Sequence, residues 1–255
     1  MSDPNQPFQP PPPPPLAETP QPVGETLSAP ATLTGVFFEP GRVFDALRAQ
    51  PRFLAATIIL LLLTIAVTFV VYQRIDMGEY IRSKMEKSSS SAQQTPEQKE
   101  MGVKFGKIIG AVLIPASVPI TVFAGAALYL LGVMAFGGSI SYKQSLAVWA
   151  YSSLPPAVFA SIVAILVLFL KAADTIDPEH MLVTNPGAFM SAESSPVVVA
   201  LLSQFDILRF YGLFLAALGL RKVARMSSGS AWGVVISLWL IGAILKVSSA
   251  AIFGR

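Results

Sequence analysis

The sequence predicts an all-α membrane protein, a polytopic transmembrane helical bundle of five spans that follows a disordered, proline-rich N-terminal tail. Three observations support this fold class. The 255 residues are 53% hydrophobic and only 13% charged, whereas about a quarter of the residues of an ordinary soluble domain are charged. Five largely uncharged runs reach the roughly twenty residues that a helix needs to cross a bilayer. Pro, Gln, Thr and Ser dominate residues 1–32, which offer little apolar material for a core.

The chain therefore divides into a tail, residues 1–32, and a membrane domain, residues 33–255. Six consecutive prolines, Pro10–Pro15, favour a polyproline II helix, which can be a ligand for aromatic-lined grooves. No positive residue flanks these prolines, so a solvated tail is favoured over such a ligand. Residues 1–35 contain no Lys or Arg and no apolar h-region, so we expect no cleavable signal peptide.

The membrane domain begins with the stretch "LTGVFFEPGRVFDALRAQPRF". Pro40 suits the first turn of a helix, and Val43, Phe44 and Leu47 recur at helical spacing. The segment is either a short helix that lies in the membrane interface or an amphipathic lead-in to the first span.

Five apolar runs follow as candidate spans. We assign the first to residues 53–72, the second to 108–136, interrupted by Pro115 and Pro119, and the third to 145–170. The fourth lies in the run Pro196–Leu220 and is assigned to residues 204–222; the fifth covers residues 232–253.

Basic residues predict the orientation of this bundle. Arg221, Lys222 and Arg225 lie in the short connection between spans four and five, and such short basic loops stay in the cytoplasm. Arg42, Arg48 and Arg52 favour a cytoplasmic N-terminus, which agrees after four crossings. The longer connection between spans one and two is also basic but is easier to translocate. We therefore expect residues 1–52 and 221–230 in the cytoplasm, and residues 73–106, 171–203 and the C-terminus outside.

The third span contains an unusual stretch, "AVWAYSSLPPAVFA". Prolines in a membrane helix free backbone carbonyls that lipid cannot hydrate, so neighbouring helices or hydroxyl groups must satisfy them. Ser152 and Ser153 stand directly before Pro155 and Pro156, with Tyr151 beside them. The stretch predicts a kink packed against protein, which makes Tyr151, Pro155 and Pro156 candidate structural or functional residues.

Three segments together resemble the Yip1 family of five-span membrane proteins, in its compact bacterial form. They are "FFEPGRVFDALRAQPRF", "SYKQSLAVWAYSSLP" and "FDILRFYGLFLAALGLRKVARMSSGSAW", and the resemblance covers about residues 33–253. It implies a helical bundle with a cytoplasmic N-terminus and an external C-terminus, in the inner membrane if the protein is bacterial. Eukaryotic relatives are implicated in vesicle trafficking and bind small GTPases, but this tail lacks the acidic and aromatic residues expected of such a docking region.

Charged residues inside the predicted spans are candidate sites, because charges at membrane depth are costly. Asp206 and Arg209 are spaced to pair on one face of the fourth span. Only Phe210–Leu220 separates them from the basic loop, so we expect a structural ion pair near the outer interface in preference to an ion pathway. Lys246 lies near the end of the fifth span, within snorkelling reach of the interface.

Glycines mark candidate packing positions. Gly102, Gly106 and Gly110 are spaced for close approach of a second helix, although a chance run of small residues explains them equally well. Gly219 lies within the fourth-span segment that carries the family resemblance, and is added to the candidate residues.

Catalysis is not predicted. The chain contains no cysteine and one histidine, His180, in a polar loop where Asp174, Asp177 and Glu179 form at most a loose metal site. Motifs for a metalloprotease or a phosphate-binding loop are missing. We expect no catalytic, metal or cofactor-binding residues, no cofactor, and, from the small net charge of +3, no nucleic-acid partner.

The sequence thus predicts a non-enzymatic multi-pass membrane protein, a scaffold or adaptor for membrane organisation or trafficking. Its expected partners are the lipid bilayer and a membrane protein or a second copy of the chain. The alternative is a small-solute or ion transporter that uses the Pro-interrupted spans two and three.

Overall fold

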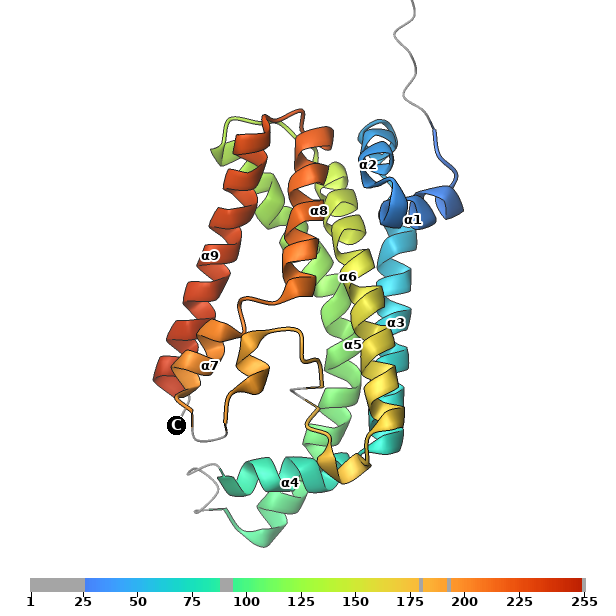
Figure 1. The fold of residues 1–255 in the computed structure, drawn as a ribbon. Coiled ribbons are helices and arrows are strands. Elements are labelled where there is room, and N and C mark those ends of the chain that lie inside the picture. The colour runs from blue at the N-terminus through green and yellow to red at the C-terminus, as the bar shows by residue number, and fades with distance from the viewer. Residues whose placement is uncertain (1–25, 88–93, 179–180, 192–193, 254–255) are drawn as a thin grey trace, which may run out of the picture.

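The computed structural model describes residues 26–87, 94–178, 181–191 and 194–253. All regular secondary structure in the described part is helical (Figure 1). The helices are α1 (Ala29–Phe38), α2 (Pro40–Ala49), α3 (Leu54–Arg74), α4 (Met77–Lys87), α5 (Pro96–Ala135), α6 (Tyr142–Leu170), α7 (Pro196–Leu202), α8 (Ile207–Val223) and α9 (Ser228–Phe253). Two short 3₁₀ turns, η2 (Ala173–Thr175) and η3 (Pro186–Phe189), lie between α6 and α7.

Long apolar helices form the body of the molecule. Among the described residues, α3, α5, α6 and α9 are each long and apolar enough to cross a membrane. The pair α7 and α8 meets the same criteria only when taken together, and is bent by 47° at the break between the two helices. Large apolar side chains remain exposed along the outer faces of the long helices, as is expected where lipid is the solvent. The fold class is confirmed as a helical membrane bundle with four or five candidate spans.

The connections alternate between the two ends of the bundle (Figure 1). The helices α1 and α2 and the turn between α8 and α9 lie at one end, and α4 and the end of α9 lie at the other. An ion pair ties the first end together, because Lys222 Nζ lies 2.7 Å from Asp45 Oδ2. At the other end the Arg74 guanidinium donates to the carbonyl of Leu168 at 2.9 Å, joining the end of α3 to the end of α6.

The N-terminal helices pack on protein. Pro40 occupies the first turn of α2, as predicted, and Val43, Phe44 and Leu47 are buried, with α2 lying against α8 and α6. The preceding helix α1, capped by Ser28, was not predicted, and it takes in residues 29–32 that the sequence analysis assigned to the tail. Residues 1–25 lie outside the described part of the chain.

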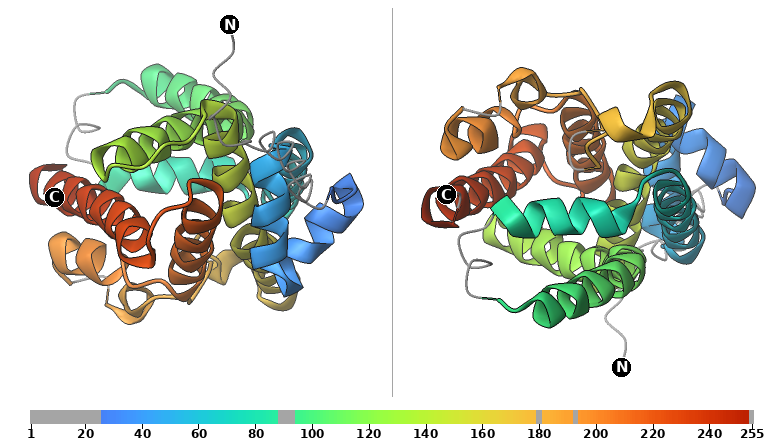
Figure 2. Two further views of the ribbon diagram at one scale, coloured as in Figure 1. Left: turned by 90° about the horizontal axis from the view of Figure 1, so that it is seen from above. Right: turned by 90° about the horizontal axis from the view of Figure 1, so that it is seen from below.

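The second span begins earlier than its apolar run. Thr95 and Gln98 form a reciprocal capping box, so α5 starts at Pro96, twelve residues before the predicted start at residue 108. This extension packs against α4, which lies across the end of the bundle (Figures 1 and 2). The three glycines Gly102, Gly106 and Gly110 face Met85, Ile81 and Tyr72, so their small size admits α4 and α3 closely.

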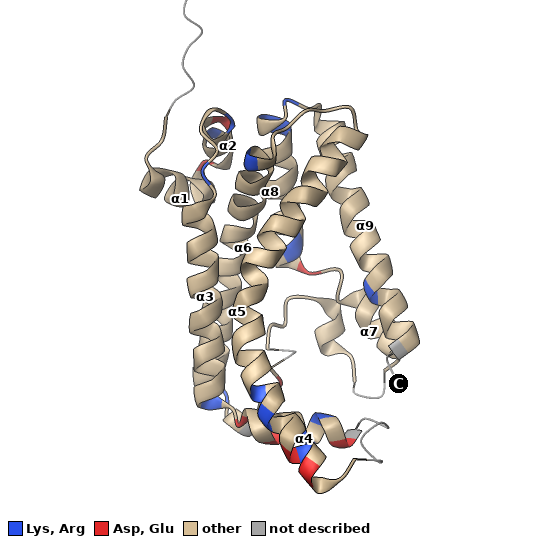
Figure 3. Cartoon of the chain, turned by 180° about the vertical axis from the view of Figure 1, so that it is seen from behind, with Lys and Arg blue, Asp and Glu red and all other residues tan. Residues whose placement is uncertain are grey.

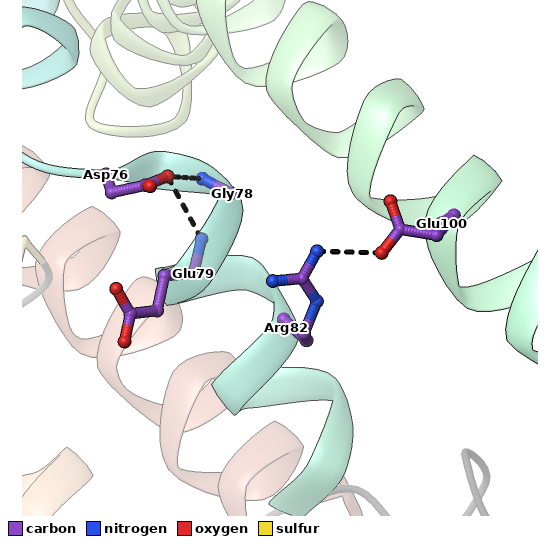
Figure 4. A network of polar contacts seen from close by, with 5 residues as sticks. All are labelled: Asp76, Gly78, Glu79, Arg82 and Glu100. Atoms are coloured by element: carbon purple, nitrogen blue, oxygen red, sulfur yellow. Dashed lines mark hydrogen bonds and ion pairs between the residues drawn. The ribbon is translucent and has the colours of Figure 1, made fainter.

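Polar contacts hold α4 in place (Figure 4). Asp76 Oδ1 accepts from the backbone N–H of Gly78 at 2.8 Å and of Glu79 at 3.1 Å, which caps the start of α4. Arg82 then bridges to Glu100 of α5 at 2.7 Å. Charged residues gather in this way at the two ends of the bundle, with a few between the ends near the start of α8 and on α9 (Figure 3).

Candidate functional site

A cavity of about 570 Å³ lies at the break between α7 and α8. It is bounded by α5, α6, α8, α9 and the segment that precedes α7. Its polar lining comes from Tyr129, Ser152, Ser153, Thr184, Asn185, Ser203, Asp206, Arg209 and Lys246. The remaining lining is apolar or small, including Pro156, Ala157 and Leu213.

The cavity is level with the middle of α6. Gly212, in the second turn of α8, packs on Pro156, which is the middle residue of α6: a Cβ atom on Gly212 would lie 3.5 Å from Pro156 Cγ. The start of α8 therefore lies about halfway along the bundle, as Figure 1 shows. This is deeper than the sequence analysis expected, because it placed Asp206 and Arg209 near the outer interface.

A non-helical segment reaches this depth from the end that carries α4. The backbone N–H of Ile207 donates to the carbonyl of Thr184 at 3.1 Å, so residue 184 lies beside the start of α8. Asn185 then caps η3 by accepting from the N–H of Ala188. Irregular backbone at membrane depth occurs where protein or a polar cavity surrounds it. The segment that was expected to form an external loop, residues 171–203, thus supplies part of the cavity wall.

Asp206 is the N-cap of α8. One carboxylate oxygen accepts from the backbone N–H of Arg209 at 2.9 Å, which satisfies a donor left open at the helix start. The other oxygen accepts from the Thr184 hydroxyl, and the Asn185 side chain also bonds to the carboxylate. Asp206 thereby links the entering segment to α8.

Arg209 pairs with a neutral residue, which corrects the predicted ion pair. Its Nη1 donates to Gln204 Oε1 at 2.8 Å, and buried Gln204 in turn donates to the carbonyl of Ala200 at 3.0 Å. Within the described part of the chain Arg209 forms no ion pair with Asp206. The i,i+3 spacing predicts an ion pair only when both residues lie within the helix. Asp206 precedes α8 as its N-cap, so its carboxylate turns toward the backbone and away from the guanidinium of Arg209.

Lys246 lies on α9 and lines the same cavity. Its side chain is exposed, and among the described residues it makes neither a hydrogen bond nor an ion pair. The sequence analysis expected this lysine to snorkel to the interface. The structure instead places it together with Arg209 at the cavity.

The two prolines of α6 contribute differently. Tyr151 and Pro155 are buried in the core, whereas Pro156 lines the cavity. The helix runs unbroken through both prolines. The carbonyls that lose their usual donors are those of Tyr151 and Ser152, four residues before each proline. The Ser152 hydroxyl donates to the backbone carbonyl of Trp149 at 3.1 Å. The Ser152 carbonyl faces α8, because a Cβ atom on Gly212 would lie 3.8 Å from its oxygen.

Gly219 lies outside the cavity, where α2, α6 and α8 meet. A Cβ atom there would lie 2.8 Å from Val148 Cγ1 and 2.9 Å from Phe44 Cε1, which is closer than real Cβ contacts. Only glycine allows the three helices to approach this closely.

Sequence reasoning missed the cavity residues Thr184, Asn185 and Ser203. The available signal was the moderately apolar stretch "MLVTNPGAFM" after a charged loop, which is too short to span and too apolar for a solvated connection. A second cavity of about 400 Å³ extends toward α3 and shares Ala160, Leu182, Thr184, Asn185 and Asp206 with the first.

The loose metal site of the sequence analysis falls partly outside the described residues, which exclude Glu179 and His180. In the part of the chain that the structure describes, no group of three metal-ligating side chains comes together.

Comparison with known proteins bears on the whole membrane domain. The Yip1 domain matches residues 34–249. The chain belongs to the Yip1 domain family. This assignment confirms the resemblance inferred from the sequence. A relative of this Yip1 protein, membrane protein YknW of Bacillus subtilis (strain 168), is 24% identical over 228 residues, which cover 89% of the chain and 93% of the relative. No solved structure matches the chain.

Proposed function

We propose that this Yip1 protein is a non-enzymatic scaffold or adaptor that holds a membrane-protein partner or a second copy of itself in the bilayer. The observation that carries the proposal is the packing around the proline pair of α6. Tyr129 of α5 bonds to Ser152 and stacks on Trp149 at a centroid distance of 4.8 Å. Gly212 of α8 packs on Pro156, and Phe37 of α1 meets Phe159 at 6.3 Å. Helices from three other parts of the chain therefore converge on the prolines.

This convergence supports a framework role for the prolines, which means that they fix how the surrounding helices pack and do not bind a solute. Helix association in lipid depends on close packing and on satisfied polar groups, because lipid tails are as apolar as the helices. A rigid centre fixes the relative positions of the outer apolar faces, which a partner or a second copy can then recognise. Fit at the centre matters more than chemistry under this proposal.

Location and orientation follow from the same proposal. The end with α2 carries Arg42, Arg48, Arg221 and Arg225, the last two in the short α8–α9 connection, whereas the basic residues of the other end lie in the longer connection around α4. The positive-inside rule favours the first end as cytoplasmic. We therefore place the N-terminus inside and the C-terminus outside, and the plasma membrane is the proposed location, in line with a bacterial relative that is named a membrane protein.

The second candidate function is transport of a small solute or ion. The broken span α7–α8 beside a polar cavity favours it, since interrupted helices mark the binding sites of many transporters. The scaffold remains our first choice because α6 stays a continuous helix through its prolines.

A double substitution, Pro155→Ala with Pro156→Ala, separates the two functions. Alanine restores two backbone donors and removes the proline rings, so a framework role predicts a lower thermal midpoint of the purified protein. It also predicts that the wild type, extracted from native membranes in mild detergent, has a higher mass by light scattering than one chain, and that the double variant does not. A normal midpoint together with loss of potassium chloride or potassium phosphate flux in proteoliposomes would favour the transporter.

A further inference from the structure

The charges that line the cavity at the α7–α8 break do not balance. Three charged side chains line it, namely Asp206, Arg209 and Lys246. The carboxylate of Asp206 is already occupied by the hydroxyl of Thr184, the side chain of Asn185 and backbone N–H groups at the start of α8. Its hydrogen-bonding capacity is largely used, and its single negative charge balances at most one of the two cations, Arg209 and Lys246.

Both cations retain unused hydrogen-bond donors. The Arg209 guanidinium has five N–H donors, and its bond to the neutral amide of Gln204 at 2.8 Å uses one of them. Lys246 bonds to no other residue that the structure describes. Cations in a membrane segment are expensive and usually serve a ligand or a pathway. Their presence beside one cavity, on the neighbouring helices α8 and α9, requires a negative counter-charge.

We propose that this cavity binds the phosphate group of an anionic amphiphile, with the phosphate oxygens held between Arg209 and Lys246. Guanidinium and ammonium groups are the usual partners of phosphate, and two cations on different helices can each bind a separate oxygen. The volume of about 570 Å³ lies within the range of ligand cavities and is larger than a bare phosphate needs.

The adjoining cavity accounts for the apolar part of the ligand. It shares a wall with the first cavity, and its lining from α3, α5, α6 and the segment before α7 includes the apolar Val67, Ile114, Ala164 and Met181 beside the hydroxyl-bearing Thr64, Thr68 and Ser161. An acyl chain fits against the apolar side chains of this lining, whereas a soluble phosphate would leave it empty. A lipid headgroup is therefore the source that the shape favours, and free phosphate is the other source of the same chemistry.

Lys246→Gln is the cleanest test, because the side chain supports no other described contact and the variant should fold normally. The purified full-length protein is titrated with phosphatidylglycerol in nanodiscs or mixed micelles, and binding is followed by thermal midpoint and by native mass spectrometry. Loss of one charged hydrogen bond should weaken apparent binding about tenfold. Arg209→Gln should do the same, and Arg209→Lys should restore part of the loss.

The matched control is Lys143→Gln, an identical change at an exposed position in the first turn of α6. It should leave binding unchanged. Inorganic phosphate added without lipid distinguishes the sources: stabilisation by phosphate alone that disappears in Lys246→Gln supports the site with a soluble ligand, and stabilisation only by phosphatidylglycerol supports the lipid. Equal lipid binding by the wild type and the Arg209→Gln/Lys246→Gln variant would overturn the proposal.

Discussion

At the scale of single residues, Gly219 is the most sensitive position of the helix packing. Its neighbours Val148 and Phe44 are fully buried, so neither can move aside for an added methyl group. We expect Gly219→Ala to lower the free energy of unfolding by about 1–3 kcal/mol, the usual cost of overpacking, despite the better helix propensity of alanine.

Gly242 of α9 provides the control for this substitution. A Cβ atom there would meet nothing within 4 Å. Gly242→Ala should therefore leave the thermal midpoint unchanged or raise it slightly. Equal effects of the two substitutions would show that α2, α6 and α8 do not meet closely at residue 219.

Asp206 caps the start of α8 and bonds to Thr184 in the segment before α7. Its substitution should therefore act through these two contacts and not through an ion pair with Arg209. Asparagine caps helices as well as aspartate does, so Asp206→Asn should have a small effect, while Asp206→Ala should cost about 1–2 kcal/mol of stability. The exchange variant, Asp206→Arg with Arg209→Asp, should not recover the stability that Asp206→Ala loses, because the two side chains do not form an ion pair in the described structure. Unfolding in detergent measures all three variants, and rescue by the exchange would restore the ion-pair interpretation.

At the scale of elements, the sequence was informative where composition alone decides the structure. The long apolar runs predict α3, α6 and α9 within a few residues, because only a helix satisfies the backbone in lipid. The amphipathic start of α5 and the helix α1 were missed, since polar or short segments carry no such constraint. The segment around Thr184 was missed because its position depends on contacts with α8 that lie far away in the sequence.

The helix α4 should respond to acid. Hydrogen bonds from the N–H groups of Glu79 and Gly78, helped by the nearby charges of Lys107 and Arg82, lower the pKa of Asp76 below its ordinary value of 3.8. A carboxyl group with a lowered pKa stabilises the folded state above its unfolded pKa, and this contribution is lost as the pH falls through the folded pKa. The start of α4 should therefore begin to loosen only below the ordinary pKa of 3.8, and it should open as the pH falls through the lower pKa of Asp76 in the folded protein.

Hydrogen exchange of the α4 amides against pH measures this opening. Asp76→Asn keeps a capping oxygen but cannot titrate, so its α4 should exchange at the same degree of protection between pH 3 and pH 6 once the intrinsic exchange rate is removed. A wild-type profile that is equally flat would contradict the capping role of Asp76.

The glycine face of α5 should control the attachment of α4. A Cβ atom on Gly106 would lie 3.1 Å from Ile81 Cδ1, so Gly106→Val must push α4 away. We expect faster hydrogen exchange in α4 with little change in α8. Gly242→Val, the same change on α9, is the control, and unchanged exchange in α4 of Gly106→Val would show that the glycines are incidental.

At the scale of the whole molecule, the account depends on the pair α7–α8 crossing the membrane as one broken span. The ion pair between Lys222 and Asp45 brings the α8–α9 turn to the same end as α2. Residues 171–178, by contrast, follow the end of α6 at the end of the bundle that carries α4. With five crossings, the proposed orientation places α2 and the α8–α9 turn in the cytoplasm and the end of α9 outside.

Cysteine accessibility tests this arrangement most directly, because the chain contains no cysteine of its own. Single cysteines at the exposed positions Ser83, Ser191 and Ser228 are treated in intact cells with a membrane-impermeant thiol reagent. We predict that residues 83 and 191 are labelled and that residue 228 is labelled only after the membrane is opened. Labelling of 191 and 228 on the same side would contradict the broken span, and labelling of 228 alone in intact cells would invert the orientation.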